Sequence, residues 1–260
     1  MSGHARIPQW IKKGWPAAAT VILLLILWEW GALLGRIEPY ILPRPSSIWE
    51  EFISQPGRIL QHTWVTVRIT IAGFAVGALL GIMASIPLHL VSWIHSALYP
   101  LVIISQNIPI IIMAPLLFIW FGYTLVPHFI IISLVCFFPI TMACLSGYQQ
   151  TDGTMINYMK MSGASRLQIF TKLEWPYSLP FLFSGLKISA AYSVMGVVIA
   201  EWSAGSQEGI ASYMKIAQSS FRVDRVFIGC FMIIIFSLVM VGLVSWAEKK
   251  LLRWKPDTRK

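Results

Sequence analysis

The chain has 260 residues, of which 57% are hydrophobic and 12% are charged, and its formal net charge at pH 7 is +9. Soluble domains carry about 25% charged residues, so this composition excludes a soluble globular protein. The basic residues stand between apolar blocks and at the chain ends, which argues against a nucleic-acid-binding stripe and indicates contact with lipid headgroups. We expect an all-α integral membrane protein in the lipid bilayer, with no nucleic acid partner.

Six apolar segments are long enough to cross a bilayer, which takes roughly 20 helical residues each. In chain order they cover 17–34, 69–91, 98–121, 125–147, 180–200 and 226–246. The first is longer than a signal-peptide core and no small-residue cleavage site follows it, so we expect an uncleaved helix. The chain then divides into an N-terminal segment 1–16, a first transmembrane helix 17–34, an external loop 35–68, a five-helix core 69–247 and a basic tail 248–260.

The distribution of basic residues predicts the orientation. With the N-terminus inside, twelve Lys and Arg residues lie on the inner side and six on the outer side, while Arg68 and Lys187 lie at or within spans. Basic residues are enriched in cytoplasmic segments, so both termini are expected to be cytoplasmic. In the external loop, Ser46 or Ser47 is expected to cap a short polar helix. Cys136, Cys144 and Cys230 all lie in apolar runs and are interpreted as small apolar residues.

Polar residues at membrane depth are costly unless they face the bundle interior or water, so they are candidates for a solute path. Several have an alternative role: Glu29 and Lys187 can snorkel to the interfaces, and Arg68 can anchor to headgroups. A polar cluster before Pro109 can either cap a kink or line the path, and Glu201 with Trp202 can contact a solute or a partner at the outer face. The predicted path residues are Ser105, Gln106, Asn107, Arg68, Glu201 and Trp202.

Gly73, Gly77 and Gly81 form a repeated G-x-x-x-G pattern in the second span. Small residues at this spacing let another helix approach closely. We interpret the three glycines as a helix-packing face, either static or part of a moving interface.

The internal loop 151–176 is too polar to span the membrane and too patterned for a passive linker. Thr151 or Asp152 is expected to cap a helix over 154–161, which Gly163 ends. Ser165 with Gln168 predicts a capping box for a second helix, with Ile169, Phe170 and Leu173 on its apolar face, and Pro176 is expected to end it. Such a pair of helices can bind a soluble partner or rest on headgroups.

This loop resembles the signature loop of the permeases of binding-protein-dependent ABC importers. In that family the loop reads Glu-Ala-Ala, three residues, Gly, nine residues, an aliphatic residue, one residue and Leu-Pro. Gly163, Leu173 and Pro176 match the pattern, whereas Asn157, Tyr158 and Met159 replace Glu-Ala-Ala and Trp175 replaces the Leu. The stretches ILPRPSSIWEEF, IPIIIMAPLLFIWFG, VIAEW and EKKLLRW also resemble the subgroup that imports sulfonates, taurine, nitrate or thiamine precursors.

The resemblance implies a type I importer permease fold with about six transmembrane helices and a cytoplasmic coupling-helix loop, in the cytoplasmic membrane of a prokaryote. It implies a pair of permeases as a homodimer, two ATPase subunits that carry ATP and Mg²⁺, and an extracytoplasmic binding protein. The residues expected to couple to the ATPase are Asn157, Tyr158, Met159, Gly163, Ala164, Ser165, Leu173 and Pro176.

The sequence contains no phosphate loop, carboxylate dyad, nucleophile triad or metal-ligand spacing, so we expect a non-enzymatic subunit that binds no cofactor itself. An ion-coupled secondary transporter is the main alternative, but it would need more intramembrane carboxylates. A membrane-embedded enzyme is the second alternative. A hydroxymethyl- or formylamino-pyrimidine precursor of thiamine is the first expected substrate, followed by alkanesulfonates or taurine, nitrate and riboflavin.

Overall fold

The computed structural model describes residues 9–205 and 208–253, and all regular structure in these ranges is helical. Residues 1–8 of the predicted N-terminal segment and 254–260 of the predicted basic tail lie outside the described residues. In chain order the elements are α1 (Gln9–Leu34), α2 (Pro45–Ser54), α3 (Pro56–Leu90), α4 (Ser92–Ser105), α5 (Ile110–Phe121), α6 (Leu125–Gln149), α7 (Gly153–Met161), α8 (Arg166–Ile169), the π-helix η1 (Phe170–Glu174), α9 (Trp175–Ala204), α10 (Ile210–Ser219) and α11 (Val223–Leu251).

The prediction of an all-α membrane protein is confirmed. Four helical stretches are long and apolar enough to cross a membrane, namely α3, α6, the continuous run Arg166–Ala204 and α11. The bent pair of α4 and α5 can form a fifth span, and α1 contributes a shorter apolar helix over Ala18–Leu34. The count agrees roughly with the expected six.

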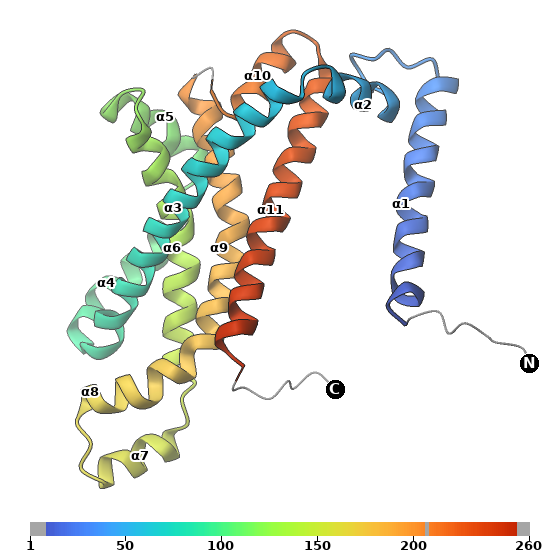
Figure 1. The fold of residues 1–260 in the computed structure, drawn as a ribbon. Helices are drawn as coiled ribbons and strands as arrows, with labels where there is room; N and C mark the ends of the chain where they lie inside the picture. Colours follow the sequence, from blue (N-terminus) through green and yellow to red (C-terminus); the bar gives the residue numbers. More distant parts are fainter. Residues whose placement is uncertain (1–8, 206–207, 254–260) are drawn as a thin grey trace, which may run out of the picture. The chain divides into compact units, whose positions relative to one another are not determined.

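Two compact units are present, the first built from the described residues of 1–60 and 213–230 and the second from those of 61–212 and 231–260. In the second unit, α6 and α9 pack side by side along their lengths (Figure 1). Their apolar core includes Ile132, Cys136, Cys144 and Val197, all fully buried. Within this unit α5 lies at one end of the α6–α9 pair and α7 with α8 at the other.

The three glycines of α3 face α6. A Cβ atom added to Gly73 would come within 2.7 Å of Ile132, and one added to Gly77 within 2.8 Å of Cys136. At Gly81 it would lie 3.0 Å from a backbone oxygen of α6. The glycines therefore let the α3 and α6 backbones approach more closely than any side chain would permit.

The predicted span 98–121 is not one helix. Helix α4 ends at Ser105, α5 begins at Ile110, and the two axes are bent by 98°. Pro109 has no N–H to donate to the Ser105 carbonyl, which instead accepts from the Ile108 N–H at 3.2 Å. Asn107 Nδ2 donates to the Ile103 carbonyl at 2.7 Å, so the Asn107 side chain caps the last turn of α4 at the break.

The expectation that Pro176 ends the second loop helix is wrong, because the helical run continues from Arg166 to Ala204. The π-helix η1 ends at Glu174, two residues before the proline, and the Trp175 N–H donates to the Phe170 carbonyl five residues earlier. This local π register shifts the hydrogen-bond ladder just where proline lacks a donor, so the chain passes into α9 unbroken.

In the first unit, the prediction that Ser46 or Ser47 caps α2 is also wrong. Pro45 occupies the start of α2, and Arg44 at the N-cap makes no side-chain cap. The Glu29 carboxylate of α1 instead accepts from the Ser46 N–H at 3.1 Å and from its hydroxyl at 2.8 Å. Glu29 therefore has a local structural partner, and a carboxylate near a helix N-terminus is electrostatically favourable.

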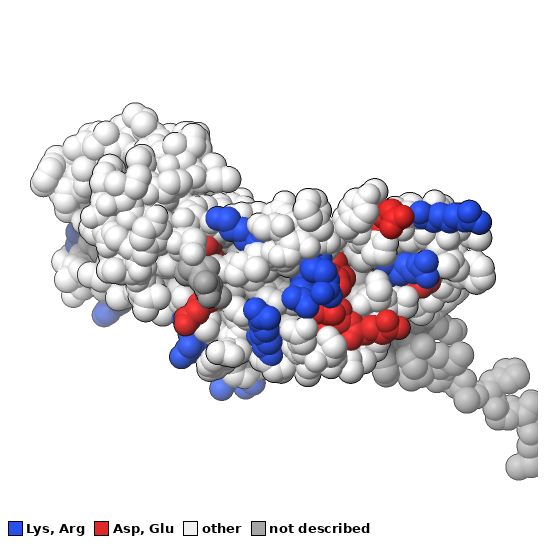
Figure 2. Space-filling model, turned by 90° about the horizontal axis from the view of Figure 1, so that it is seen from above, with Lys and Arg blue, Asp and Glu red and all other residues white. Residues whose placement is uncertain are grey.

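Charged side chains of the first unit form ion pairs with one another. Glu51 of α2 binds Arg222 and Arg225, both at 2.8 Å, and Arg222 also binds Asp224. Seen from above, the molecule shows acidic and basic side chains interspersed rather than separated (Figure 2). That face therefore presents no large field of one sign.

Candidate functional site

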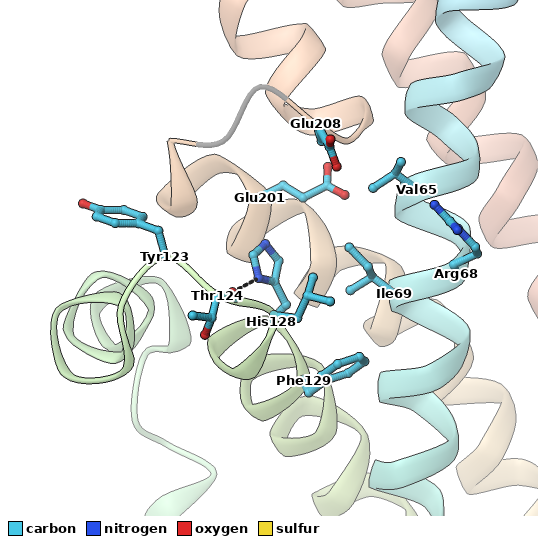
Figure 3. Close-up of a pocket in the computed structure, with 10 residues that line it drawn as sticks. Val65, Arg68, Ile69, Tyr123, Thr124, His128, Phe129, Glu201 and Glu208 are labelled. Atoms are coloured by element: carbon cyan, nitrogen blue, oxygen red, sulfur yellow. Dashed lines mark hydrogen bonds between the residues drawn. The ribbon is translucent and has the colours of Figure 1, made fainter.

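A cavity of about 480 Å³ opens at the α5 end of the second unit. Its walls come from α3, from the turn between α5 and α6, from α6 and from the end of α9 (Figure 3). The lining residues are Val65, Arg68, Ile69, Tyr123, Thr124, Leu125, His128, Phe129, Glu201 and Glu208. Cavities of this size accommodate small organic ligands.

Glu201 lines this cavity, although only 1% of its surface is exposed, and hydrogen bonds hold its side chain in place. Its carboxylate accepts from the Thr66 hydroxyl at 2.6 Å and from the Ala211 N–H at 2.9 Å. Thr66 in turn accepts from the Ile210 N–H at 2.8 Å. Because a buried charge is tolerated only when it is hydrogen-bonded, this set fixes the start of α10 to α9 and α3.

Gly209 explains how the chain returns so closely to Glu201. Its φ is +98°, a conformation that glycine adopts without a Cβ penalty. An added Cβ would also collide with the Glu201 carboxylate. The glycine is therefore required both by its backbone conformation and by space.

The remaining walls of the cavity mix charge with aromatic surface. Arg68 is exposed and lies over the Trp64 ring at 5.9 Å, a distance typical of a cation–π contact. His128 Nδ1 lies 3.1 Å from the Thr124 carbonyl and its ring packs edge-on against Phe118. With Glu201 and Glu208 opposite Arg68, the lining has no excess of positive charge (Figure 3).

The predicted path residues separate into two places. Arg68 and Glu201 both line the cavity. Gln106 and Asn107 are exposed at the break between α4 and α5, Ser105 donates to the Val102 carbonyl, and none of the three is among the cavity-lining residues. Trp202 is 40% exposed beside Glu201 and also lies outside the lining.

At the opposite end of α6 and α9, the loop 151–176 contains the two short helices expected from its sequence. Asp152 caps α7, accepting from the Thr154 N–H at 2.8 Å. Gly163 has φ +80°, its N–H donates to the Lys160 carbonyl and the Ala164 N–H donates to the Met159 carbonyl, both at 3.0 Å. These two bonds are a Schellman motif, in which a left-handed residue ends the helix.

The second helix begins with the expected capping box. Ser165 accepts from the Gln168 N–H at 3.3 Å, and the Gln168 side chain accepts from the Ser165 N–H at 2.7 Å. Ile169 and Phe170 are buried, as predicted, whereas Arg166 and Lys172 are exposed. Of the remaining loop residues, Leu173 and Pro176 are half-buried.

Apolar side chains lie exposed on the outside of the loop, and of these only Tyr158 was among the predicted coupling residues. Met161 is 84% exposed, Tyr158 66% and Leu167 63%, and all three lie on α7 or α8. Asn157 is also exposed, and Met159 and Ala164 are half-buried. An exposed apolar group beside polar residues is typical of a protein-binding surface.

Sequence reasoning also missed several buried polar residues. Thr66 at the cavity contacts Glu201, and His89 near the loop contacts Glu174, so these residues have partners far away in the chain. His128, also at the cavity, contacts the Thr124 carbonyl four residues earlier. Lys187, for which snorkelling to the inner interface was one alternative, forms an ion pair with Glu248 at 2.9 Å. No local sequence signal marks the long-range pairs, because they arise when helices pack.

Comparisons with known proteins place this arrangement in context. Residues 77–253 match the family model described as the binding-protein-dependent transport system inner membrane component. The chain is 32% identical over 224 residues to a probable ABC transporter permease protein of Haemophilus influenzae, covering 86% of this chain and 91% of the relative.

Two further relatives carry substrate names. A formylaminopyrimidine transport permease protein of Halalkalibacterium halodurans is 30% identical, with 90% of this chain and 93% of the relative covered. A riboflavin transport system permease protein of Chloroflexus aurantiacus is 29% identical, with 93% and 91% covered.

Proposed function

This chain belongs to the family of binding-protein-dependent transport system inner membrane components, the non-catalytic permease subunits of ABC importers, and from that premise we propose that it imports a small, flat heteroaromatic solute. The first candidate is a hydroxymethyl- or formylamino-pyrimidine precursor of thiamine. Two copies of the chain enclose the path, and the cavity beside Glu201 is the outer section of that path.

The composition of the cavity wall carries this proposal. A pyrimidine ring offers a face for stacking and ring nitrogens for hydrogen bonds, and the wall provides Tyr123, Phe129 and His128 together with Arg68 and Glu208. A sulfonate would be favoured by a strongly basic wall, whereas here Arg68 is offset by two glutamates. The mixed lining supports a neutral solute over a sulfonate or nitrate.

Riboflavin is the second candidate, because one relative is named as a riboflavin permease and a flavin is also a flat heteroaromatic. The two candidates differ in size and in the ribityl chain of riboflavin. Competition for uptake distinguishes them without any assumption about the cavity.

The loop 151–176 supports the second part of the proposal, namely that an ATPase drives transport. With the N-terminus in the cytoplasm, as the basic residues predict, α7 and α8 lie on the cytoplasmic side. Their exposed apolar side chains form the proposed docking surface for the ATPase, whose own chain holds ATP and Mg²⁺. ATP-driven closure of the ATPases then moves the loop, and the spans switch between inward-facing and outward-facing states.

Uptake in cells tests the substrate proposal. The permease is expressed with its ATPase and binding protein in a host that lacks its own pyrimidine-precursor and riboflavin uptake, and radiolabelled hydroxymethylpyrimidine is supplied. We expect ATP-dependent uptake that unlabelled formylaminopyrimidine suppresses and taurine does not. Suppression by taurine, or uptake of labelled riboflavin alone, would replace the pyrimidine with the corresponding alternative.

A further inference from the structure

Two buried glutamates lie at opposite ends of the helical run through η1 and α9, and each binds α3. Glu201 accepts from Thr66, as described above, and Glu174 Oε2 lies 2.8 Å from His89 Nε2. At 1.5 Å per residue, Thr66 and His89 are about 35 Å apart along α3, and the two glutamates about 40 Å apart along α9. The two helices are therefore tied at both ends.

The inner tie has a third member that belongs to the loop. Arg166, the first residue of α8, donates from Nη1 to Glu174 Oε1 at 2.6 Å. The Glu174 side chain is 2% exposed, the His89 side chain 13% and the Arg166 side chain 46%. One buried carboxylate thus joins the end of α3, the loop and the start of α9. We call this set of three residues the inner clamp.

The Glu174 carboxylate brings two donor groups together. An ionised carboxylate can only accept, so the 2.8 Å contact of His89 Nε2 with Glu174 is a hydrogen bond in the tautomer that carries a hydrogen on Nε2. In that tautomer the 3.0 Å approach of Arg166 Nη2 to the same nitrogen is a contact between two donors and not a hydrogen bond. Glu174 therefore has donors on both oxygens, as a buried carboxylate requires.

Aromatic rings shield the clamp from water. The His89 ring lies 4.8 Å from the Tyr148 ring and 6.1 Å from the Phe170 ring, measured between centroids. The Tyr148 hydroxyl is 3.2 Å from the Ser85 hydroxyl of α3. With water excluded, the interactions of Glu174 are screened much less than those of a surface ion pair.

The π-helix places Glu174 in this position. An extra residue in the helical turn changes which residues face α3, so that Ile169, Phe170 and Glu174 are all buried while Thr171 and Lys172 are exposed. π-turns within helices are frequent at functional sites. The π-helix η1 is five residues long and the buried carboxylate of Glu174 belongs to its last residue.

We propose that Glu174, His89 and Arg166 are positioning residues for energy coupling: the inner clamp makes the loop, α3 and α9 move as one body. This inference rests on the proposed function, in which an ATPase drives the loop. Without the clamp, the loop would still dock on the ATPase. The helical run would then bend at η1, between α8 and α9, and the displacement of the loop would not reach the rest of α9. ATP hydrolysis would then continue without gating of the cavity.

Site-directed labelling at the far end tests the inference without knowledge of the solute. Val126→Cys, which is 47% exposed beside the cavity and is not among its lining residues, is introduced with Cys230→Ser, and the complex with its ATPase and binding protein is reconstituted in nanodiscs. The rate of labelling by a membrane-impermeant maleimide is measured with and without ATP and vanadate, alongside ATP hydrolysis. Glu174→Gln is compared with Glu248→Gln, which makes the same change in the half-exposed pair with Lys187.

We expect Glu174→Gln to reduce the ATP-dependent change in labelling rate about tenfold, within the range of typical coupling free energies, while hydrolysis persists and Glu248→Gln behaves as the parent. Arg166→Lys should retain part of the response and Arg166→Gln should lose it. Because the Arg166 side chain is partly exposed, its replacement should not prevent folding. These two variants therefore test the clamp even if Glu174→Gln does not assemble. A full response in Glu174→Gln or in Arg166→Gln overturns the clamp. If ATP leaves the labelling rate of the parent unchanged, the proposed ATP-driven function fails instead.

Discussion

Replacement of Gly163 should weaken docking of the loop on the ATPase and leave insertion of the protein into the membrane unchanged. Gly163 has φ +80°, and an added Cβ would meet no atom within 4 Å, so the constraint there is conformational and not steric. Gly163→Ala therefore costs about 1–2 kcal/mol, the penalty of a left-handed residue with a side chain. Gly163→Pro is more severe, because proline cannot adopt this φ and has no N–H to donate to Lys160.

The magnitude for proline follows from the two bonds of the Schellman motif. Each is worth about 1 kcal/mol, so their loss removes about 2 kcal/mol and the turn between α7 and α8 must rearrange. We expect the protein to insert and purify normally, since α7 is solvent-exposed and no core residue is touched. Uptake should fall strongly and association with the ATPase should weaken.

Gly153→Ala is the matched control. Gly153 is also a glycine of this loop, an added Cβ would again meet nothing within 4 Å, and its φ is not positive. Uptake and co-purification of the ATPase are measured for the parent, Gly153→Ala, Gly163→Ala and Gly163→Pro. Parent-level uptake by Gly163→Pro would refute the role assigned to the turn.

Three other variants test the anchoring of α10, the packing of α3 and the path residues before Pro109. Glu201→Ala leaves buried donors without an acceptor, at about 1–3 kcal/mol each, so the thermal stability of the purified protein should drop and uptake should fail; an unchanged melting temperature would show that the carboxylate does not anchor α10. Gly77→Val overlaps α6 and should cost about 1–3 kcal/mol by overpacking, lowering the yield of folded protein, and a normal yield would contradict the close approach. Gln106→Ala combined with Asn107→Ala should weaken uptake while the ATPase remains bound, and intact uptake would confine solute recognition to the cavity beside Glu201.

Local signals predicted the loop well. The capping box of Ser165 and Gln168, the cap at Asp152 and the stop at Gly163 each depend on residues within a few positions of one another. Their geometry is decided by backbone hydrogen bonds that form in almost any context. For this reason the sequence was sufficient.

Proline was harder to interpret, because its effect depends on what the neighbouring backbone can do. Pro109 was expected to kink one span, yet the two halves are bent by 98°. Pro176 was expected to end a helix, yet a π-turn absorbs it. In both cases the outcome depended on which neighbouring backbone groups form bonds in place of the missing N–H.

Pairings between distant residues could not be predicted. His89 and Glu174 are 85 positions apart, and Thr66 and Glu201 are 135 apart. Glu174 in particular stands between Leu173 and Trp175 in the loop, and no local pattern there singles it out. Only the packing of α3 against α9 shows that it is buried.

The most direct measurement is photo-cross-linking from the loop to the ATPase. A photoreactive residue at Met161, which is 84% exposed on α7, is compared with one at Trp120, which is 65% exposed on α5 at the opposite end of the α6–α9 pair. We expect an adduct with the ATPase from position 161, its loss with Gly163→Pro, and no adduct from position 120. A complex that imports solute on ATP hydrolysis yet yields no adduct from position 161 would contradict this expectation.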